Sequence, residues 1–188
     1  SNIRFPGLGV GGYCLTKDPT FAPASSSQLF GKDLSFPFST MAVKINHNMP
    51  LHVVDRLKSL LNEKLYGKRI LVCGVSYRTD VADTRYSPSE ILVRKLFELE
   101  AIVTCHDPYV DYWEELEMNL SHSLPRPTNF DAIIFAVSHQ EYRDLDLIKW
   151  GIKNSIIIDA NMVFNDNQRT SARLSGIKIE SIGRGDGL

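Results

Sequence analysis

Lys-Arg-Ile-Leu-Val-Cys-Gly-Val (residues 68–75) is the stretch that decides the fold class. Its apolar run is flanked by charge, which is typical of a parallel strand buried on both faces. Further along, Ser87 is followed by a proline, a serine and Glu90. A capping serine, a proline at the first helical position and a glutamate three residues after the cap predict a helix start with a capping box.

Short β-rich runs recur at residues 101–105, 131–137, 155–160 and 177–182. The segments between them are long enough for the crossovers that parallel strands require. We therefore expect an α/β domain over residues 67–188, built as a Rossmann-like open parallel sheet with flanking helices.

The first third of the chain differs in composition. Residues 1–37 are rich in Gly, Pro and Ser, which predicts a loop-dominated segment with regular structure confined to short turns. From Ser39 apolar residues recur at helical spacing up to Gly67, interrupted by Pro50. This predicts two consecutive helices over residues 38–66, with a break or kink near Pro50. Their combined length suggests an apolar face shared with another subunit.

Charge and cysteine content exclude several function classes. The 188 residues carry a formal net charge of −1, so no strong field attracts nucleic acid or an anionic membrane. No apolar stretch reaches the roughly 20 residues of a membrane span. Three widely spaced cysteines fit neither a disulfide framework nor a zinc site, and the five histidines show no ligand spacing with them. We expect a cytoplasmic protein without a metal.

A glycine-rich stretch near the N-terminus formally matches a dinucleotide-binding pattern. Gly7, Gly9 and Gly12 satisfy Gly-x-Gly-x-x-Gly, which requires a preceding strand and a following helix. Pro6 leaves no room for the strand, and Pro19 stops any helix within two turns, so we reject this interpretation. The glycines instead free the backbone to approach a ligand closely.

Cys14 follows this loop, with Lys17 and Asp18 shortly after it. A nearby ammonium favours the thiolate, which attacks an aldehyde to give a thiohemiacetal and, after hydride loss, a thioester. Asp18 is a candidate base for the water that hydrolyses the thioester. On residue chemistry alone, an inert buried thiol in a glycine-rich turn stays an equal alternative.

The loop after the first strand is a second candidate site. Ligands bind beyond the carboxyl ends of strands in such sheets. Tyr77, Arg78 and Arg85 offer a flat ring and two cations for a phosphate or sugar. A solvated loop whose arginines pair with Asp80 and Asp83 is the favoured alternative without other information.

Two motifs resemble those of a known family. Gly-Val-Gly-Gly-Tyr-Cys-Leu-Thr-Lys-Asp-Pro (residues 9–19) resembles the cysteine motif of the UDP-glucose/GDP-mannose dehydrogenase family. Residues 74–88, with Asp-Pro-Tyr-Val at 107–110, resemble the signature of its C-terminal domain. The resemblance covers essentially the whole chain in order. It implies oxidation of a nucleotide-sugar alcohol to a carboxylate, in two NAD-dependent hydride transfers through an enzyme thioester.

The resemblance also implies roles for individual residues. Cys14 would be the nucleophile, Asp18 would assist water activation, and Lys17 would lie on the nicotinamide side. Arg85 would reach towards NAD, which would be bound mainly by an N-terminal domain that this chain lacks. Substrate binding, to a UDP-sugar or a GDP-sugar, would involve Phe5, Gly7, Gly9, Gly11, Gly12, Tyr77 and Arg78.

The same resemblance predicts a homodimer through the helices at residues 38–65, with Asn46 in the family's Asn position. It predicts three segments: a catalytic-cysteine loop at 1–37, dimerisation helices at 38–66 and a UDP-sugar-binding domain at 67–188. The chain, which starts at Ser1 without an initiator methionine, is expected to be part of a longer enzyme and inactive alone.

Some positions depart from the family pattern. Thr16 replaces a usual Pro, Arg78 replaces a usual Lys, and Asn161 stands where many members have an Arg. The residues at Val10 and at Pro6-Gly7 resemble more closely the branch of the family that oxidises N-acetyl-hexosamines. Two alternative functions stay open: a non-catalytic nucleotide-binding or dimerisation module, and an NAD-independent cysteine hydrolase or acyltransferase that uses Cys14 with a histidine.

Overall fold

The computed structural model describes residues 6–152 and 154–184, and its centre is a five-stranded parallel sheet. The strands lie in the order β2-β1-β5-β6-β7. Their bounds are β1 Arg69–Cys73, β2 Ile102–His106, β5 Ala132–Phe135, β6 Ile156–Asp159 and β7 Ile179–Ser181. All four pairings are parallel. The predicted Rossmann-like α/β fold is confirmed.

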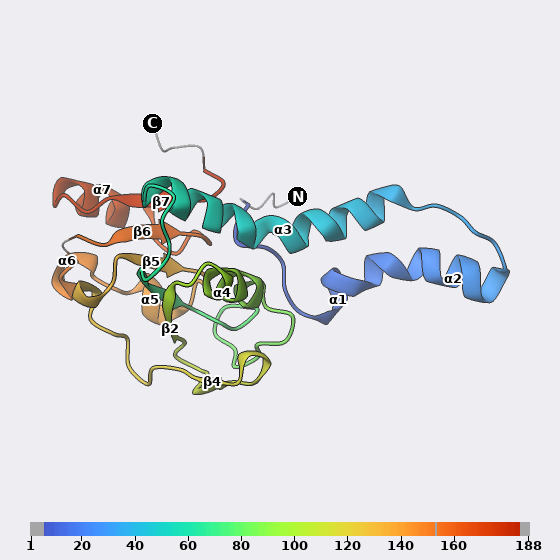
Figure 1. Ribbon diagram of the computed structural model, residues 1–188, viewed down its shortest axis with the longest axis horizontal. Coiled ribbons are helices and arrows are strands. Elements are labelled where there is room, and N and C mark those ends of the chain that lie inside the picture. Colours follow the sequence, from blue (N-terminus) through green and yellow to red (C-terminus); the bar gives the residue numbers. More distant parts are fainter. Residues whose placement is uncertain (1–5, 153, 185–188) are drawn as a thin grey trace.

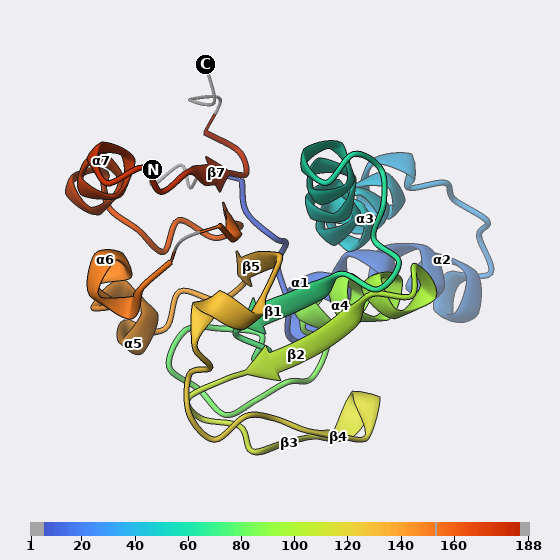
Figure 2. The ribbon, with the colours of Figure 1, turned by 60° about the vertical axis from the view of Figure 1, so that its left-hand side comes forward.

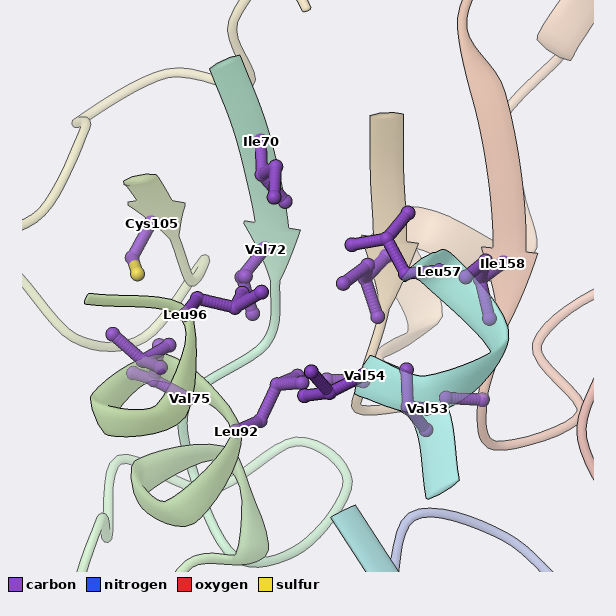
Figure 3. Packing of buried hydrophobic residues seen from close by; sticks show 14 of the residues in the cluster. Val53, Val54, Leu57, Ile70, Val72, Val75, Leu92, Leu96, Cys105 and Ile158 are labelled. Atoms are coloured by element: carbon purple, nitrogen blue, oxygen red, sulfur yellow. The ribbon is translucent and has the colours of Figure 1, made fainter. Parts of the chain in front are cut away.

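Helices cover both faces of the sheet (Figure 2). On one face lie α4 (Pro88–Glu98) and the C-terminal half of α3 (Pro37–Leu60), and on the other lie α5 (Gln140–Arg143), α6 (Leu147–Trp150) and α7 (Asp166–Leu174). Because successive side chains of a strand point to opposite faces, Ile70 and Val72 pack in one core cluster and Leu71 in the other. Figure 3 shows Leu92 of α4 and Val54 of α3 meeting in the first cluster.

A small unit replaces a helix between β2 and β5. It consists of β3 (Tyr112–Trp113) and β4 (Met118–Asn119), which pair antiparallel, with the 3-10 helices η2 (Glu114–Leu116) and η3 (Pro127–Asn129). Trp113 is fully buried, as a packing residue should be.

The start of α4 confirms the predicted cap but not the predicted capping box. Ser87 Oγ accepts from the Ser89 amide at 3.2 Å. The Glu90 carboxylate accepts from Arg94 Nε at 2.8 Å, one turn further along, instead of returning to the Ser87 amide. The i,i+4 ion pair therefore takes the carboxylate that a capping box would use.

The predicted division of the long helix is wrong, because α3 runs unbroken from Pro37 to Leu60 with Pro50 inside it. Pro50 removes the hydrogen bond to the Asn46 carbonyl and crowds that carbonyl with its ring. Burial of Val53 and Leu57 against the sheet holds the helix together beyond that point.

The expectation that residues 1–37 are loop-dominated is also wrong for residues 13–30. This stretch forms α1 (Tyr13–Lys17), the 3-10 helix η1 (Asp18–Thr20) and α2 (Phe21–Phe30). Pro19 and Pro23 lie in the first turns of η1 and α2, where the missing N–H has no helical partner to lose. With residues 37–49 of α3, these helices form an arm that projects from the sheet domain (Figure 1). No described helix is long and apolar enough to cross a membrane.

Candidate functional site

The glycine loop (residues 6–12) lies directly on the cationic loop (residues 76–86) that follows β1. A Cβ added to Gly11 would lie 2.8 Å from Tyr77 Cβ and 2.8 Å from the Tyr86 carbonyl oxygen. Gly12, at φ +82°, lies against the Tyr77 ring. The two candidate sites predicted from separate parts of the sequence are therefore one site, because only glycine permits so close a contact.

Asn46 of α3 holds the glycine loop from the opposite side. Its Oδ1 accepts from the Val10 amide at 2.8 Å, and its Nδ2 donates to the Val10 carbonyl at 2.8 Å. Leu8, next to this clamp, is buried in the same core cluster as Val53. The glycine loop is thus fixed by two polar contacts and one apolar anchor.

A cavity of about 800 Å³ lies between the glycine loop, the arm and the cationic loop. This volume is in the range of small-molecule sites. Of the predicted substrate-binding residues, Gly7, Gly9, Gly11, Tyr77 and Arg78 line it, whereas Gly12 contacts Tyr77 without lining it and Phe5 lies outside the described residues. The remaining lining residues are Pro6, Val10, Leu15, Phe38, Met41, Ala42, Ile45, Asn46, Met49 and Asn161.

The cavity has a polar end and an apolar wall. Arg78, Tyr77 and Asn161 give the polar end, and the side chains of α3 give the wall. Among the described residues, no carboxylate lies within ion-pair distance of Arg78, so its charge is available to a ligand. Asn161 donates through Nδ2 to the Ala136 carbonyl at 3.2 Å. Its Oδ1 lies where a Cβ on Gly7 would meet it, at 2.7 Å.

Arg85 behaves as the solvated-loop alternative predicts. Its Nε and Nη2 donate to the two carboxylate oxygens of Asp83 at 2.9 and 2.6 Å. This pairing lowers the pKa of Asp83 and raises that of Arg85. The guanidinium also lies 5.0 Å from the ring centre of Tyr13. The Tyr13 ring packs edge-on against the Tyr86 ring, with 4.8 Å between the two ring centres. The cationic loop therefore holds the residue that precedes Cys14.

Cys14 is exposed, so the alternative of an inert buried thiol is wrong. Burial raises the pKa of the Cys105 thiol to about 12, and that of Cys73 well above its usual value. α1 ends with the Asp18 amide donating to the Cys14 carbonyl, which gives the helical turn that places residues 14, 17 and 18 on one side. Lys17 Nζ lies 3.9 Å from the Asp18 carboxylate. These three side chains do not line the cavity, whose wall includes their neighbour Leu15.

Comparison with known proteins identifies the family. The UDP binding domain of the UDP-glucose/GDP-mannose dehydrogenase family matches residues 71–166, which is more than half of the chain. The chain belongs to this family. The match begins within β1 and includes the whole cationic loop and Asn161.

Several similar proteins have names that describe them as dehydrogenases of N-acetylated nucleotide sugars. The UDP-N-acetyl-D-mannosamine dehydrogenase of Methanococcus vannielii is 32% identical, over 98% of this chain and 42% of its own length. The solved UDP-D-ManNAc dehydrogenase of Pyrococcus horikoshii is 29% identical with a TM-score of 0.79, covering 99% of this chain and 41% of its own. The solved NDP-N-acetyl-D-galactosaminuronic acid dehydrogenase of Methanosarcina mazei is 28% identical with a TM-score of 0.80, and the match covers 97% of this chain and 40% of its own. The chain thus spans about two fifths of the length of these relatives.

Sequence reasoning missed two features of this family member. The Asn46 clamp on Val10 was not foreseen, although an amide among the apolar residues of a helix signals a backbone partner. The second feature is a buried network around Asp107. In both features the bonded partners lie more than 30 residues apart, so no local pattern indicates the pairing.

Proposed function

We propose that this chain is the cysteine-bearing and nucleotide-sugar-binding part of an NAD-dependent dehydrogenase that oxidises a UDP-N-acetylhexosamine to the uronate. The observation that carries the proposal is the cavity where the glycine loop, Tyr77, Arg78 and Asn161 meet beside the cysteine helix. The named relatives act on sugars of this class.

The cavity suits both parts of such a substrate. Arg78 presents two or more donors in a fixed fork, which matches phosphate oxygens. Tyr77 supplies a flat surface, and the backbone of Gly7, Gly9 and Gly11 approaches the ligand without side chains in the way. Asn161, in place of the usual Arg, offers a neutral amide, which favours hydrogen bonding to a sugar substituent over charge pairing.

The proposed chemistry takes place at the start of the arm. The Cys14 thiolate adds to the aldehyde carbon, and the carbonyl oxygen takes up a proton to give a thiohemiacetal. Loss of the hydride on that carbon, to NAD, and of the hydroxyl proton, to solvent, leaves a thioester. Water then attacks the thioester while Asp18 accepts one of its protons, and the Cys14 thiolate leaves. The carboxylic acid that is released loses its remaining proton to solvent and becomes the carboxylate.

NAD, when bound, accepts the hydride in each oxidation. Its main site is proposed to lie outside the described residues. We propose that Lys17, at the end of α1, and Arg85, on the cationic loop, face NAD held by a part of the enzyme that this chain does not span. Both side chains are exposed.

The arm is proposed to join two copies of the enzyme. It exposes large apolar side chains from α2 and the N-terminal half of α3: Phe21, Leu29, Phe30, Phe38, Met41 and Ile45. So much exposed apolar surface marks an interaction site, and a second copy of the same arm is the proposed partner. We further propose the division at residues 1–37, 38–66 and 67–188, a cytoplasmic location and a role in polysaccharide precursor synthesis.

Calorimetric titration with UDP-N-acetylmannosamine tests the binding proposal. The chain should bind it, and Arg78→Met should weaken binding at least tenfold, because a charge-assisted phosphate contact is worth about 1.5–3 kcal/mol. Arg173→Met, on α7 away from the cavity, serves as the charge-matched control. Equal affinities in the wild type and Arg78→Met would contradict the site.

A turnover assay tests the chemistry. The enzyme that combines this chain with its NAD-binding domain should form two NADH per sugar, and Cys14→Ser should abolish uronate formation while keeping substrate affinity. Binding without NADH formation would support the non-catalytic module instead. Thioester cleavage without NAD would support a cysteine hydrolase.

A further inference from the structure

Three loops at the carboxyl edge of the sheet meet at one buried carboxylate. Asp107 follows β2, and its side chain is fully buried. Its Oδ2 accepts from the amides of Val75 and Ser76, which follow β1, at 2.8 and 3.1 Å. The same oxygen lies 3.0 Å from Nε2 of His139, which follows β5. Asp107 therefore ties together the ends of three neighbouring strands.

The hydrogen bonds fix the tautomer of His139. The Asp80 amide donates to its Nδ1 at 2.9 Å, so Nδ1 carries a lone pair and the proton lies on Nε2. Nε2 is 3.0 Å from both Asp107 Oδ2 and Ser76 Oγ. Because Ser76 Oγ donates its own proton to the Arg78 carbonyl at 3.1 Å, it accepts from His139. All side-chain polar atoms of His139 and Ser76 are thus used within the network.

The segment that this network holds is the one that carries the proposed ligand-binding side chains. Ser76 is fixed at one end by Asp107, and Asp80 is fixed at the other by His139. Asp80 has a positive φ of 55°, and its carboxylate accepts from the Gln140 amide at 2.9 Å. Tyr77 and Arg78 lie between these two fixed points. Neither Asp107 nor His139 lines the cavity itself.

We infer that Asp107 and His139 are positioning residues for nucleotide-sugar binding, acting through the backbone of Ser76 and Asp80 on Tyr77 and Arg78. This inference rests on the proposed function. Burial alone would raise the pKa of Asp107, but the hydrogen bonds from His139 and from backbone amides outweigh it and hold the pKa below its usual value. The carboxylate is therefore charged, which strengthens the bonds it accepts.

Ser76, His139 and Asp107 are the residue types of a hydrolytic Ser-His-Asp triad, but they do not form one here. In a triad the acid and the nucleophile bind different ring nitrogens of the histidine. Ser76 and Asp107 share Nε2, and the Asp80 amide occupies Nδ1. His139 and Ser76 are also buried from solvent. The geometry points to a rigid support rather than to a nucleophile.

The test compares UDP affinity and amide hydrogen exchange in variants of the chain. His139→Leu removes both bonds of the ring, and His139→Asn keeps an acceptor near the Nδ1 position. His139→Leu should weaken UDP binding at least tenfold and speed exchange of the Asp80 amide at least tenfold, with partial recovery of both in His139→Asn. Ser76→Ala, a milder change that is more certain to fold, should weaken binding about two- to fivefold.

Tyr142→Phe is the matched control. It removes a buried hydroxyl that donates to the His106 carbonyl at 2.9 Å, but keeps the ring that packs on His139. A purely structural role for the network predicts that Tyr142→Phe and His139→Leu change UDP affinity equally, which would overturn the inference. If both His139→Leu and Ser76→Ala bind UDP as tightly as the wild type, the inference is also overturned, but the proposed function is not. Absence of UDP binding to the wild type would overturn both.

Discussion

Substitution of Gly11 by alanine should separate the two halves of the proposed site. The added Cβ would lie 2.8 Å from Tyr77 Cβ, 2.8 Å from the Tyr86 carbonyl oxygen and 2.9 Å from Pro88 Cδ. Carbon atoms in contact prefer about 3.5–4.0 Å, so the loops must separate by nearly 1 Å. Overpacking of this kind costs about 1–3 kcal/mol. Since about 1.4 kcal/mol is a factor of ten, UDP-sugar affinity should fall about 5- to 140-fold.

Calorimetry with UDP-N-acetylmannosamine measures the effect, and Gly67→Ala provides its control. Gly67 has φ +68° and nothing within 4 Å of its built Cβ, so alanine there adds backbone strain without a clash. It should lower the free energy of unfolding by about 1 kcal/mol and leave the dissociation constant unchanged. If Gly11→Ala binds the ligand as tightly as the wild type, docking of the glycine loop on the cationic loop is not needed for binding.

Three further perturbations have defined outcomes. Asn46→Ala should weaken UDP-sugar binding about 5- to 140-fold, because two hydrogen bonds of about 0.5–1.5 kcal/mol each no longer hold the glycine loop. Asn48→Ala on the same helix should leave the affinity unchanged. Burial lowers the pKa of His106 in the folded chain. As pH falls below about 6.5, His106 is therefore protonated in the unfolded chain before it is protonated in the folded chain, which favours unfolding. Urea unfolding should therefore show less stability at pH 5.5 than at pH 7.5, and His106→Asn should flatten that dependence. A thiol reagent should modify one cysteine per native chain, Cys14, and three after unfolding; a second fast thiol in the native chain would contradict the burial of the others.

The sheet could be predicted because its strands carry their own signal. Continuous apolar runs such as residues 70–73 have no other place than a doubly covered strand, and all five predicted strands form. The start of α4 was equally local, since Ser87 and Pro88 suffice to begin a helix.

The helices of the arm could not be predicted in this way. Proline usually ends regular structure, but Pro19 and Pro23 fall in first turns, where proline is tolerated. Pro50 lies within α3 because Val53 and Leu57 gain more from burial than one missing hydrogen bond costs. In both cases the outcome depends on position and packing, which composition does not record.

Residue chemistry alone predicted two separate loops, and only the family resemblance placed residues of both loops on one substrate. Gly11 and Tyr77 are far apart in the sequence, and nothing local states that they touch. Asp107 also has a local role that an Asp-Pro sequence indicates, because its Oδ1 accepts from the Tyr109 amide at 3.0 Å. Its Oδ2, which binds the loop after β1 and His139, depends on strand order alone.

A crystal structure of the chain with UDP-N-acetylmannosamine tests the central claim most directly. The account predicts the ligand in the cavity between the glycine loop and α3, with its phosphates at Arg78 and its sugar towards Asn161 and the cysteine helix. A ligand bound elsewhere, for example in the groove between α7 and β7, would contradict it.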